Sequence, residues 1–470
     1  MARESQPDLT HDFVLPTLLF AALGAMTWAV RGCSGFGGMD GCIFAGVTWG
    51  TAWWFIARDP GARQSRPYAS GWIILALTVG IGFSGNRGWM QWPSFFDGHL
   101  QTNTALGQGV PIHRAYGFLW LFIAGVPWAG LGACLLAWCG SHRPVRPYEW
   151  CLRLACGIGA AWLAMVLFDC LPEVFLPLYK TMRLQYHDLQ ANPNLGRLLR
   201  DNRAAITHLG LYLGFLGYEM GRRDWRNVTL ILTVGLVNGA GWALCQNWRW
   251  APRVWPQAGF NWWRCWESCG GISIGIAYGL AHGLVNRRSS VSDRASDGMG
   301  TAGSHPNLER FGAYLGLLLG LGLSVRNGLK GWANIYLGNE NYWDAVLWRV
   351  IGPLLLLALA ALPFWIWLRP VPGTYRSPHS LCGTGPAEQQ ACRGDVFPHA
   401  YRLVWLVLLV QNAIAQLITG PHSSWNETAF SLYYLLLFFL SAVILHHLSE
   451  ISRVEERPGA PAPAENANGA

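Results

Sequence analysis

Charged residues are scarce in this chain: they make up 13% of its 470 residues, against about 25% in ordinary globular proteins. Apolar residue types reach 52%. A soluble protein of this length exposes too much surface to cover it with so few charges. The composition therefore excludes a set of soluble domains and predicts a polytopic membrane protein whose first partner is the lipid bilayer.

Lysine is almost absent, because the 34 basic residues include only Lys180 and Lys330 as lysines. The arginines are spread over many short loops rather than gathered on one face, so a nucleic-acid partner is not expected. Residues 1–12 carry three acids and one arginine and lack the basic segment of a signal peptide. We therefore expect the first apolar stretch to remain as a helix.

Motifs for metals, cofactors and nucleophiles are also missing. The 13 histidines form no H-x-x-x-H or H-E-x-x-H pattern, and the 12 cysteines form no C-x-x-C pattern. No G-x-S-x-G, Walker A or G-x-G-x-x-G signature lies in a strand–turn–helix context. The sequence thus predicts no metal site and indicates no cofactor. Cys33 and Cys42 flank one loop and would pair in an oxidising compartment, whereas Cys265 and Cys269, at helical spacing, are interpreted as packing residues.

Long apolar segments are what the chain does contain. At the scale of about 20 residues that a membrane helix needs, twelve of them occur. They lie near residues 13–31, 41–57, 71–86, 114–139, 152–170, 204–221, 227–246, 267–286, 311–327, 345–368, 402–419 and 428–448. The predicted fold is an all-α bundle of about twelve transmembrane helices.

The loops between these segments alternate in charge. A basic loop follows every even-numbered segment but the last, and that side of the membrane, with the two termini, holds 20 of the 34 cations. Because cytoplasmic loops are the basic ones, both termini are predicted to be cytoplasmic, in a bacterial inner membrane. Residues 1–12 form the cytoplasmic start, 13–448 the bundle, and 449–470 a polar, Pro- and Ala-rich tail that we expect to be disordered.

The same alternation predicts a weak internal repeat of six helical hairpins. In most hairpins the first helix ends near Arg or Asn, and the second helix opens with an acid, an arginine or both. A duplication is one explanation of this pattern, and chance similarity of helix ends is the other. The predicted hairpins are 13–57, 71–139, 152–221, 227–286, 311–368 and 402–448.

Glycines recur at helical spacing inside three segments. In lipid, small residues allow helix backbones to approach closely, so such stripes predict helix–helix contacts. The stripes are Gly271, Gly275, Gly279 and Gly283; Gly312, Gly316 and Gly320; and Gly210, Gly214, Gly217 and Gly221.

Polar residues concentrate at the extracytoplasmic ends of the predicted helices. Acids at helix starts and arginines at helix ends complement the helix dipole, at about 0.3–1 kcal/mol each, and this explains many of them. It does not explain Arg264 with Glu267, three residues apart on one helix face. Clustered guanidinium groups suit carboxylates, phosphates or sulfates, so we predict a solute-binding basin there. Its predicted lining is Arg87, Asn247, Arg249, Trp263, Arg264, Glu267, Arg326, Asn327, Asp344 and Glu427.

Tryptophan is abundant, with 27 residues, and the predicted extracytoplasmic loops are especially rich in it. Anchoring at the membrane interface is one explanation, and a stacking platform for a sugar ring or a cation is the other. The run 246–267 mixes Trp, Arg, Asn and Glu most densely. We predict that the solute site lies there.

Three functions fit these observations. The first is a transporter or permease for a small polar solute, anionic or sugar-like. The second is a membrane-embedded transferase or hydrolase acting on a lipid-linked or periplasmic substrate, with Glu267, Asp344 or Asp169 as general base. The third is a non-catalytic membrane component of a larger assembly, which would use the Trp-rich face for docking.

Overall fold

The computed structural model describes residues 9–32, 37–57, 68–85, 92–140, 145–286, 306–368, 396–419 and 424–455. Almost every element within these ranges is a helix. The long ones are α1 (Leu15–Arg31), α2 (Met39–Ala57), α3 (Trp72–Ser84), α5 (Ala115–Gly140), α6 (Pro147–Cys170), α9 (Pro193–Gly221), α10 (Trp225–Cys245), α12 (Trp262–Val285), α14 (Pro306–Tyr336), α15 (Glu340–Leu368), α17 (Val396–Leu417) and α18 (Trp425–Glu455). The short ones are η1 (Thr10–Val14), α4 (Trp92–Phe96), η2 (Thr104–Leu106), α7 (Pro172–Phe175), α8 (Arg183–His187), η3 (Gln246–Trp250) and α11 (Ala251–Val254).

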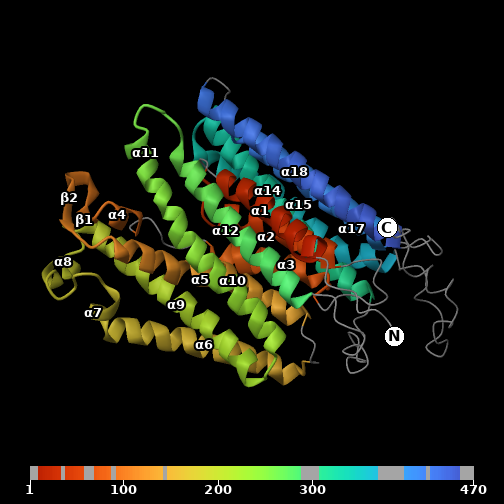
Figure 1. Cartoon of the computed structure of the whole chain (residues 1–470), viewed down its shortest axis with the longest axis horizontal. Coiled ribbons are helices and arrows are strands. Elements are labelled where there is room, and N and C mark those ends of the chain that lie inside the picture. Colours follow the sequence, from red (N-terminus) through yellow and green to blue (C-terminus); the bar gives the residue numbers. More distant parts are fainter. Residues whose placement is uncertain are drawn as a thin grey trace, which may run out of the picture.

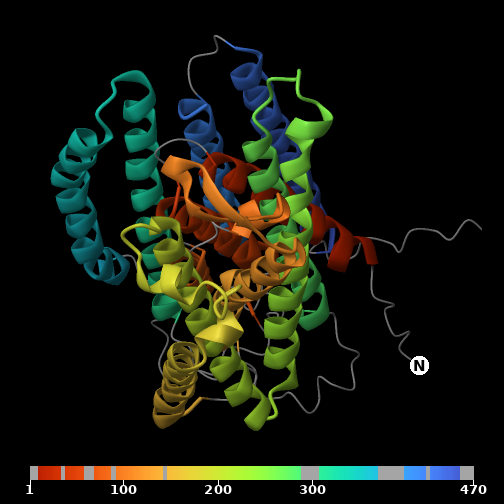
Figure 2. The same cartoon turned by 90° about the vertical axis from the view of Figure 1, so that its left-hand side faces the viewer.

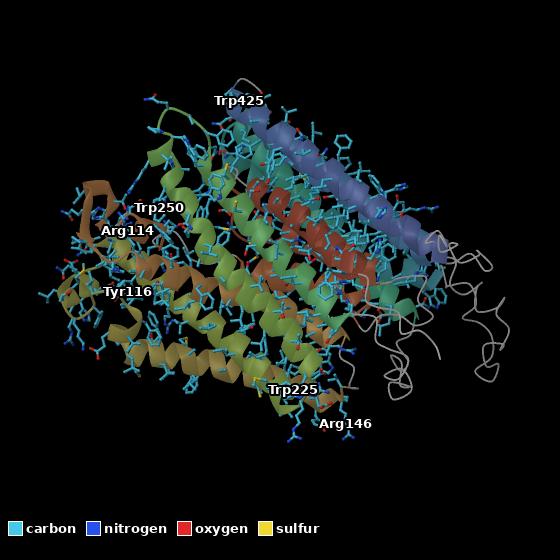
Figure 3. All side chains as sticks on the ribbon, viewed as in Figure 1. Arg114, Tyr116, Arg146, Trp225, Trp250 and Trp425 are labelled. Atoms are coloured by element: carbon cyan, nitrogen blue, oxygen red, sulfur yellow. The ribbon has the colours of Figure 1, made fainter. Side chains whose placement is uncertain are left out.

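The long helices lie side by side as one bundle with two distinct ends (Figure 1). One end carries the β1–β2 hairpin, and we call it the strand end. At the other, His11 and His447 stack with ring centroids 5.9 Å apart, and we call it the terminus end. Arg114, Tyr116, Trp250 and Trp425 lie toward the strand end and Arg146 and Trp225 at the terminus end (Figure 3).

Within the described part of the chain, nine helices are long and apolar enough to cross a bilayer. This finding establishes the coarse prediction of a helical, multi-pass membrane protein. The predicted segments that correspond to α2, α3 and α9 are not among the nine. The reason is clear for α3, whose 13 residues span about 20 Å, whereas the hydrocarbon core is about 30 Å thick.

Helices α1 and α12 are packed backbone to backbone. A Cβ atom added to Gly271 would lie 2.0 Å from the carbonyl oxygen of Gly24, and one added to Gly24 would lie 2.1 Å from the carbonyl oxygen of Gly271. Gly275 meets the Phe20 carbonyl in the same way, at 2.2 Å. The predicted contact stripe of α12 is therefore confirmed, and its partner is the first long helix.

The glycine stripes of α14 and α9 differ in how much of each packs against a neighbouring helix. Gly316 on α14 meets the backbone of α3, where an added Cβ would lie 2.5 Å from the Leu75 nitrogen, as a contact stripe predicts. On α9, Gly210 and Gly214 face α6, but nothing that the structure describes lies within 4 Å of a Cβ on Gly217 or Gly221. The prediction for α9 is thus wrong for its second half: α6 continues beside it, as the Arg153–Glu219 pair shows, but Gly217 and Gly221 do not face it.

A small antiparallel sheet interrupts the otherwise helical fold. Strands β1 (His99–Asn103) and β2 (Gln108–Pro111) pair with His99 opposite Pro111. Gly107 has φ +64° at the turn, a conformation that glycine adopts without strain, and the Asn103 side chain accepts from the Leu106 amide. The sequence predicts only a loop here, because the strands are too short and polar to show an apolar alternation.

Tryptophans fall into a buried and an exposed group. Trp92 and Trp266, which the sequence places in extracytoplasmic loops, are fully buried, whereas Trp255 and Trp425 are exposed. Interfacial anchoring thus fits only the second pair. The peripheral helices α6 and α15 expose most of their apolar side chains. The α14–α15 pair lies at one side of the bundle (Figure 2).

Candidate functional site

A buried ion pair joins the strand ends of α1 and α12. The Arg31 Nη1 atom lies 3.1 Å from both carboxylate oxygens of Glu267, and both side chains are at most 2% exposed. The second Arg31 amino group donates to the Gly85 carbonyl at 3.2 Å. The close contact at Gly24 and Gly271 brings the two helices together one turn below this pair.

A second set of charges lies on α2, α14 and α15. The Lys330 ammonium is 3.1 Å from Asp40, 3.6 Å from Glu340 and 3.8 Å from Asp344. Helix α2 links this set to the first one, because its Cys42, two residues after Asp40, lies against Gly85, whose carbonyl accepts from Arg31. Charges from five helices therefore form one connected group, which we call the strand-end cluster.

Arg326 completes this cluster. Its guanidinium group donates to Asp344 and to the side chain of Asn327, and it lies 4.3 Å from the centre of the Trp348 ring. Arg326 thus contacts two other predicted site residues, Asn327 and Asp344. The Asp344 side chain remains 39% exposed, so the cluster reaches the surface at this point.

Arg264 is arranged differently from these paired arginines. It is 8% exposed, its guanidinium carbon lies 5.0 Å from the centre of the Phe430 ring, and its Nε and Nη1 atoms are buried without a hydrogen-bond partner. Across the described ranges it forms no ion pair with an acid. Although Arg264 and Glu267 share a helix face, as their spacing predicts, Glu267 is bound by Arg31 instead.

The start of α18 supplies a second unpaired charge beside Arg264. Asn426 accepts from the Asn261 amide at 2.9 Å, and Phe260 stacks on Phe430 at 5.2 Å, so the starts of α12 and α18 are joined. At the same junction, one carboxylate oxygen of Glu427 is buried without a hydrogen-bond partner. A cation and an anion that do not reach each other therefore lie at one helix junction.

The other residues predicted for the 246–267 run have partners of their own. Arg249 binds Asp97 at 3.1 Å, together with Arg253 at 2.8 Å, and so ties η3 and α11 to the loop after α4. Asn247 donates only to the Leu244 carbonyl, one turn earlier. Trp263 packs edge-on against Trp266, with ring centroids 4.5 Å apart.

Asp169, a candidate general base, lies on the surface in an ion pair with Arg203. The two carboxylate oxygens of Asp169 accept from Arg203 at 3.0 and 2.6 Å, and both side chains are largely exposed. Glu267 and Asp344 are also ion-paired, so each acid would have to leave an arginine to act as a base.

The terminus end holds another buried ion pair, on α6 and α9. Arg153 Nε lies 2.8 Å from Glu219, and neither side chain is exposed. Three aromatic rings surround the guanidinium group, with Trp150 at 5.2 Å, Trp138 at 5.6 Å and Tyr218 at 5.9 Å from its carbon atom. These rings and the carboxylate enclose the cation with groups of the protein itself.

Further hydrogen bonds extend this pair to α10. Asn227 donates to the second Glu219 oxygen at 2.9 Å, and Tyr68 donates to Asn227 at 2.6 Å. Burial raises the pKa of Tyr68 well above its ordinary value, so its hydroxyl remains a donor. We call Arg153, Glu219, Asn227 and Tyr68 the terminus-end cluster. It links the outer pair α6–α9 to the rest of the bundle.

Seven of the ten predicted site residues therefore divide into three groups rather than one lining, and Asn247 and Trp263 belong to none of these groups. One is the strand-end cluster, one is the Arg264–Glu427 junction, and one is the clamp of Arg249 on Asp97. Arg87 and Cys33 lie outside the described residues. The residues that sequence reasoning missed as partners are Arg31, Asp40, Asp97, Arg253, Lys330 and Glu340. In sequence, Arg31 at a helix end and Asp40 at a helix start are accounted for by compensation of the helix dipole. No sequence spacing connects Arg31 with Glu267, 236 residues away.

Comparison with known proteins adds no assignment. No protein-family model matches the chain, and neither a curated protein nor a solved structure matches it.

Proposed function

We propose that this protein is a multi-pass transporter or permease for a small polar solute, anionic or sugar-like. The observation that carries the proposal is Arg264, a guanidinium group buried at a helix junction without an acid to neutralise it. Ionisable residues inside membrane bundles are costly and usually serve a ligand or an ion. A solute that brings an anionic group to Arg264 would supply the missing partner.

The chemistry of the junction favours a particular class of solute. A guanidinium group presents its N–H donors as a planar fork, which matches a carboxylate or a phosphate. Glu427 has a buried, unpartnered oxygen that would accept from a hydroxyl or an N–H group of the same solute. In this arrangement, Arg264 binds the acid group and Glu427 fixes the orientation of the solute.

We further propose the complete topology of twelve spans in six hairpins, with both termini cytoplasmic, in a bacterial inner membrane. Helices α2, α3 and α9 would complete the set of twelve spans. Arg146, Arg222, Arg223 and Arg226 lie at or near helix ends at the terminus end, which fits a cytoplasmic face. Alkaline phosphatase fused after residue 106 should be active and after residue 140 inactive, and the opposite result would invert the topology.

The function is tested by thermal unfolding of the purified protein in detergent with carboxylates, phosphates, sulfates, sugar acids and neutral sugars. A ligand at about 100 times its Kd stabilises the native state by about 2.7 kcal/mol. We expect a hit in wild type that Arg264→Gln removes. Arg253→Gln is the matched control, because it changes an exposed arginine of the same region. The same solute should then enter proteoliposomes containing wild type but not Arg264→Gln.

Other outcomes would change the proposal in defined ways. A hit that Arg264→Gln retains would place the solute elsewhere. Covalent conversion of a compound by the protein in detergent would favour the membrane-embedded enzyme. If no compound of the panel stabilises a well-folded wild-type protein, the small-solute proposal is contradicted and a component of a larger assembly is favoured.

A further inference from the structure

Two side chains of opposite charge lie at the junction between the starts of α12 and α18. Asn426 fastens this junction, because its side chain accepts a hydrogen bond from segment 259–261 and donates one back to it, both at 2.9 Å. The Arg264 guanidinium carbon lies 5.0 Å from the centre of the Phe430 ring. Since Phe430 is three residues after Glu427, these two residues share one face of α18, and Arg264 points toward that face.

Both charges have polar atoms that no described residue satisfies. Arg264 is 8% exposed, and its Nε and Nη1 atoms are buried without a hydrogen-bond partner. The Oε2 atom of Glu427 is buried in the same way, although the residue as a whole is partly exposed. The junction therefore offers a ligand one group of donors and one acceptor, and the partly exposed Glu427 connects them to the surface.

We propose that the solute bound here is a small zwitterion, with its acid group on Arg264 and its ammonium group on Glu427. This inference rests on the proposed function, because it names the class of solute at the same junction. A carboxylate or sulfonate accepts from the donor fork of a guanidinium group, and an ammonium group brings three donors to a carboxylate. One molecule of this class pairs both charges at once.

Solutes with only one kind of group satisfy the junction in part. A simple anion pairs Arg264, but it brings a second negative charge close to the Glu427 carboxylate, and like charges repel. A simple amine pairs Glu427 and adds a positive charge beside Arg264. A neutral sugar offers donors to Glu427 but leaves the buried guanidinium group without an acid. The zwitterion gives each charge an opposite partner and leaves the junction without net charge.

A series of matched compounds tests the inference on the purified protein in detergent. Thermal unfolding is titrated with alanine, with lactate, in which a hydroxyl replaces the ammonium group, and with propionate, which lacks both. Taurine and its hydroxyl analogue isethionate form a second pair, with a sulfonate as the acid group. We expect the zwitterion of at least one pair to bind about tenfold more tightly than its hydroxyl analogue, because a hydrogen bond between two charged groups contributes more than one from a neutral hydroxyl.

Two positions assign the groups of the solute to the side chains. Glu427→Gln removes the negative charge and should bring the affinities of a zwitterion and its hydroxyl analogue to within about twofold of each other, whereas Glu427→Asp should retain the preference. Arg264→Gln should abolish the binding of every acid in the series. Glu173→Gln is the matched control, because Glu173 is a largely exposed glutamate paired with Lys180, and it should leave the preference unchanged.

The outcomes separate this inference from the proposed function. Equal binding of zwitterions and hydroxyl analogues to wild type, lost in Arg264→Gln, would overturn the zwitterion and leave a transporter for an acid solute. A preference that Glu427→Gln retains would overturn the inference too, because the ammonium group would then lie elsewhere. No binding of either zwitterion, with a hit elsewhere in the solute panel, would overturn the inference alone, and no hit at all would contradict both. The comparison of ligands within wild type holds whether or not a variant folds.

Discussion

The two ends of the bundle both contain buried arginines, but the arginines are neutralised in different ways. At the terminus end, Arg153 is enclosed by Glu219 and three aromatic rings of the same protein. At the strand end, Arg31 is bound by Glu267 in a similar manner, whereas Arg264 has a ring but no acid. The difference separates charges that hold helices together from a charge that has no acid partner among the described residues.

The same contrast explains why burial alone does not identify a site. Arg153 is more deeply buried than Arg264, yet its neighbours already supply the opposite charge. An ion pair of this kind fastens one helix to another. Among the buried arginines of the described ranges, Arg264 is the one whose charge no acid neutralises. The two ends of the bundle therefore differ in whether each buried arginine has an acid partner, and substitutions at either end test this difference.

The largest effect is expected from breaking the terminus-end pair. Glu219→Gln leaves Arg153 as an unpaired buried charge, which should lower the free energy of unfolding by about 3–5 kcal/mol. Thermal and detergent-induced unfolding of the purified protein measure this loss. The double variant Arg153→Met/Glu219→Met removes both charges and should recover much of it. If Glu219→Gln were as stable as wild type, the cluster would not hold α6 and α9 in place.

A smaller effect is expected from the packing that supports the strand-end pair. Gly271→Ala places a Cβ against the Gly24 carbonyl and should cost about 1–3 kcal/mol by forcing α1 and α12 apart. Gly217→Ala is the control, since its Cβ meets nothing that the structure describes within 4 Å. Glu267→Gln should cost less in the Gly271→Ala background than in wild type, whereas the cost of Glu219→Gln should not change. Equal costs for Glu267→Gln in both backgrounds would show that the pair does not depend on this contact.

The smallest effect is expected at the exposed pair of Asp169 and Arg203. Solvent screens this pair, so Asp169→Asn should change the free energy of unfolding by less than about 1 kcal/mol. The variant should also retain ligand binding, because the pair lies apart from Arg264. A large loss of stability measured by thermal unfolding would mean that the exposure of an ion pair does not predict its contribution to the free energy of unfolding in this protein.

The apolar segments predicted several helices closely. The segment 114–139 corresponds to α5 (Ala115–Gly140), and 227–246 corresponds to α10 (Trp225–Cys245). The segment 311–327 was too short, since α14 (Pro306–Tyr336) continues beyond it. Its last turns contain Arg326, Asn327 and Lys330, which look like loop residues in sequence. They remain helical because acids on other helices neutralise the two cations.

The site was only partly predictable for a related reason. Helical spacing indicates which residues share a face, as it did for Arg264 and Glu267. It does not indicate which distant helix supplies a partner, so the bond from Arg31 to Glu267 was missed. The selection of Arg264 and Glu427 came from charge at helix ends. The sequence does not show that these two residues lack partners, because that depends on how the starts of α12 and α18 lie beside each other in the fold.

The backbone contact of α1 with α12 limits how this protein moves. Side chains that interdigitate between helices change rotamer and let the helices slide, but a carbonyl oxygen resting on a glycine Cα has no such freedom. Helices α1 and α12 should therefore move together as one rigid unit. Any displacement of α12 at the Arg264–Glu427 junction would carry α1 with it.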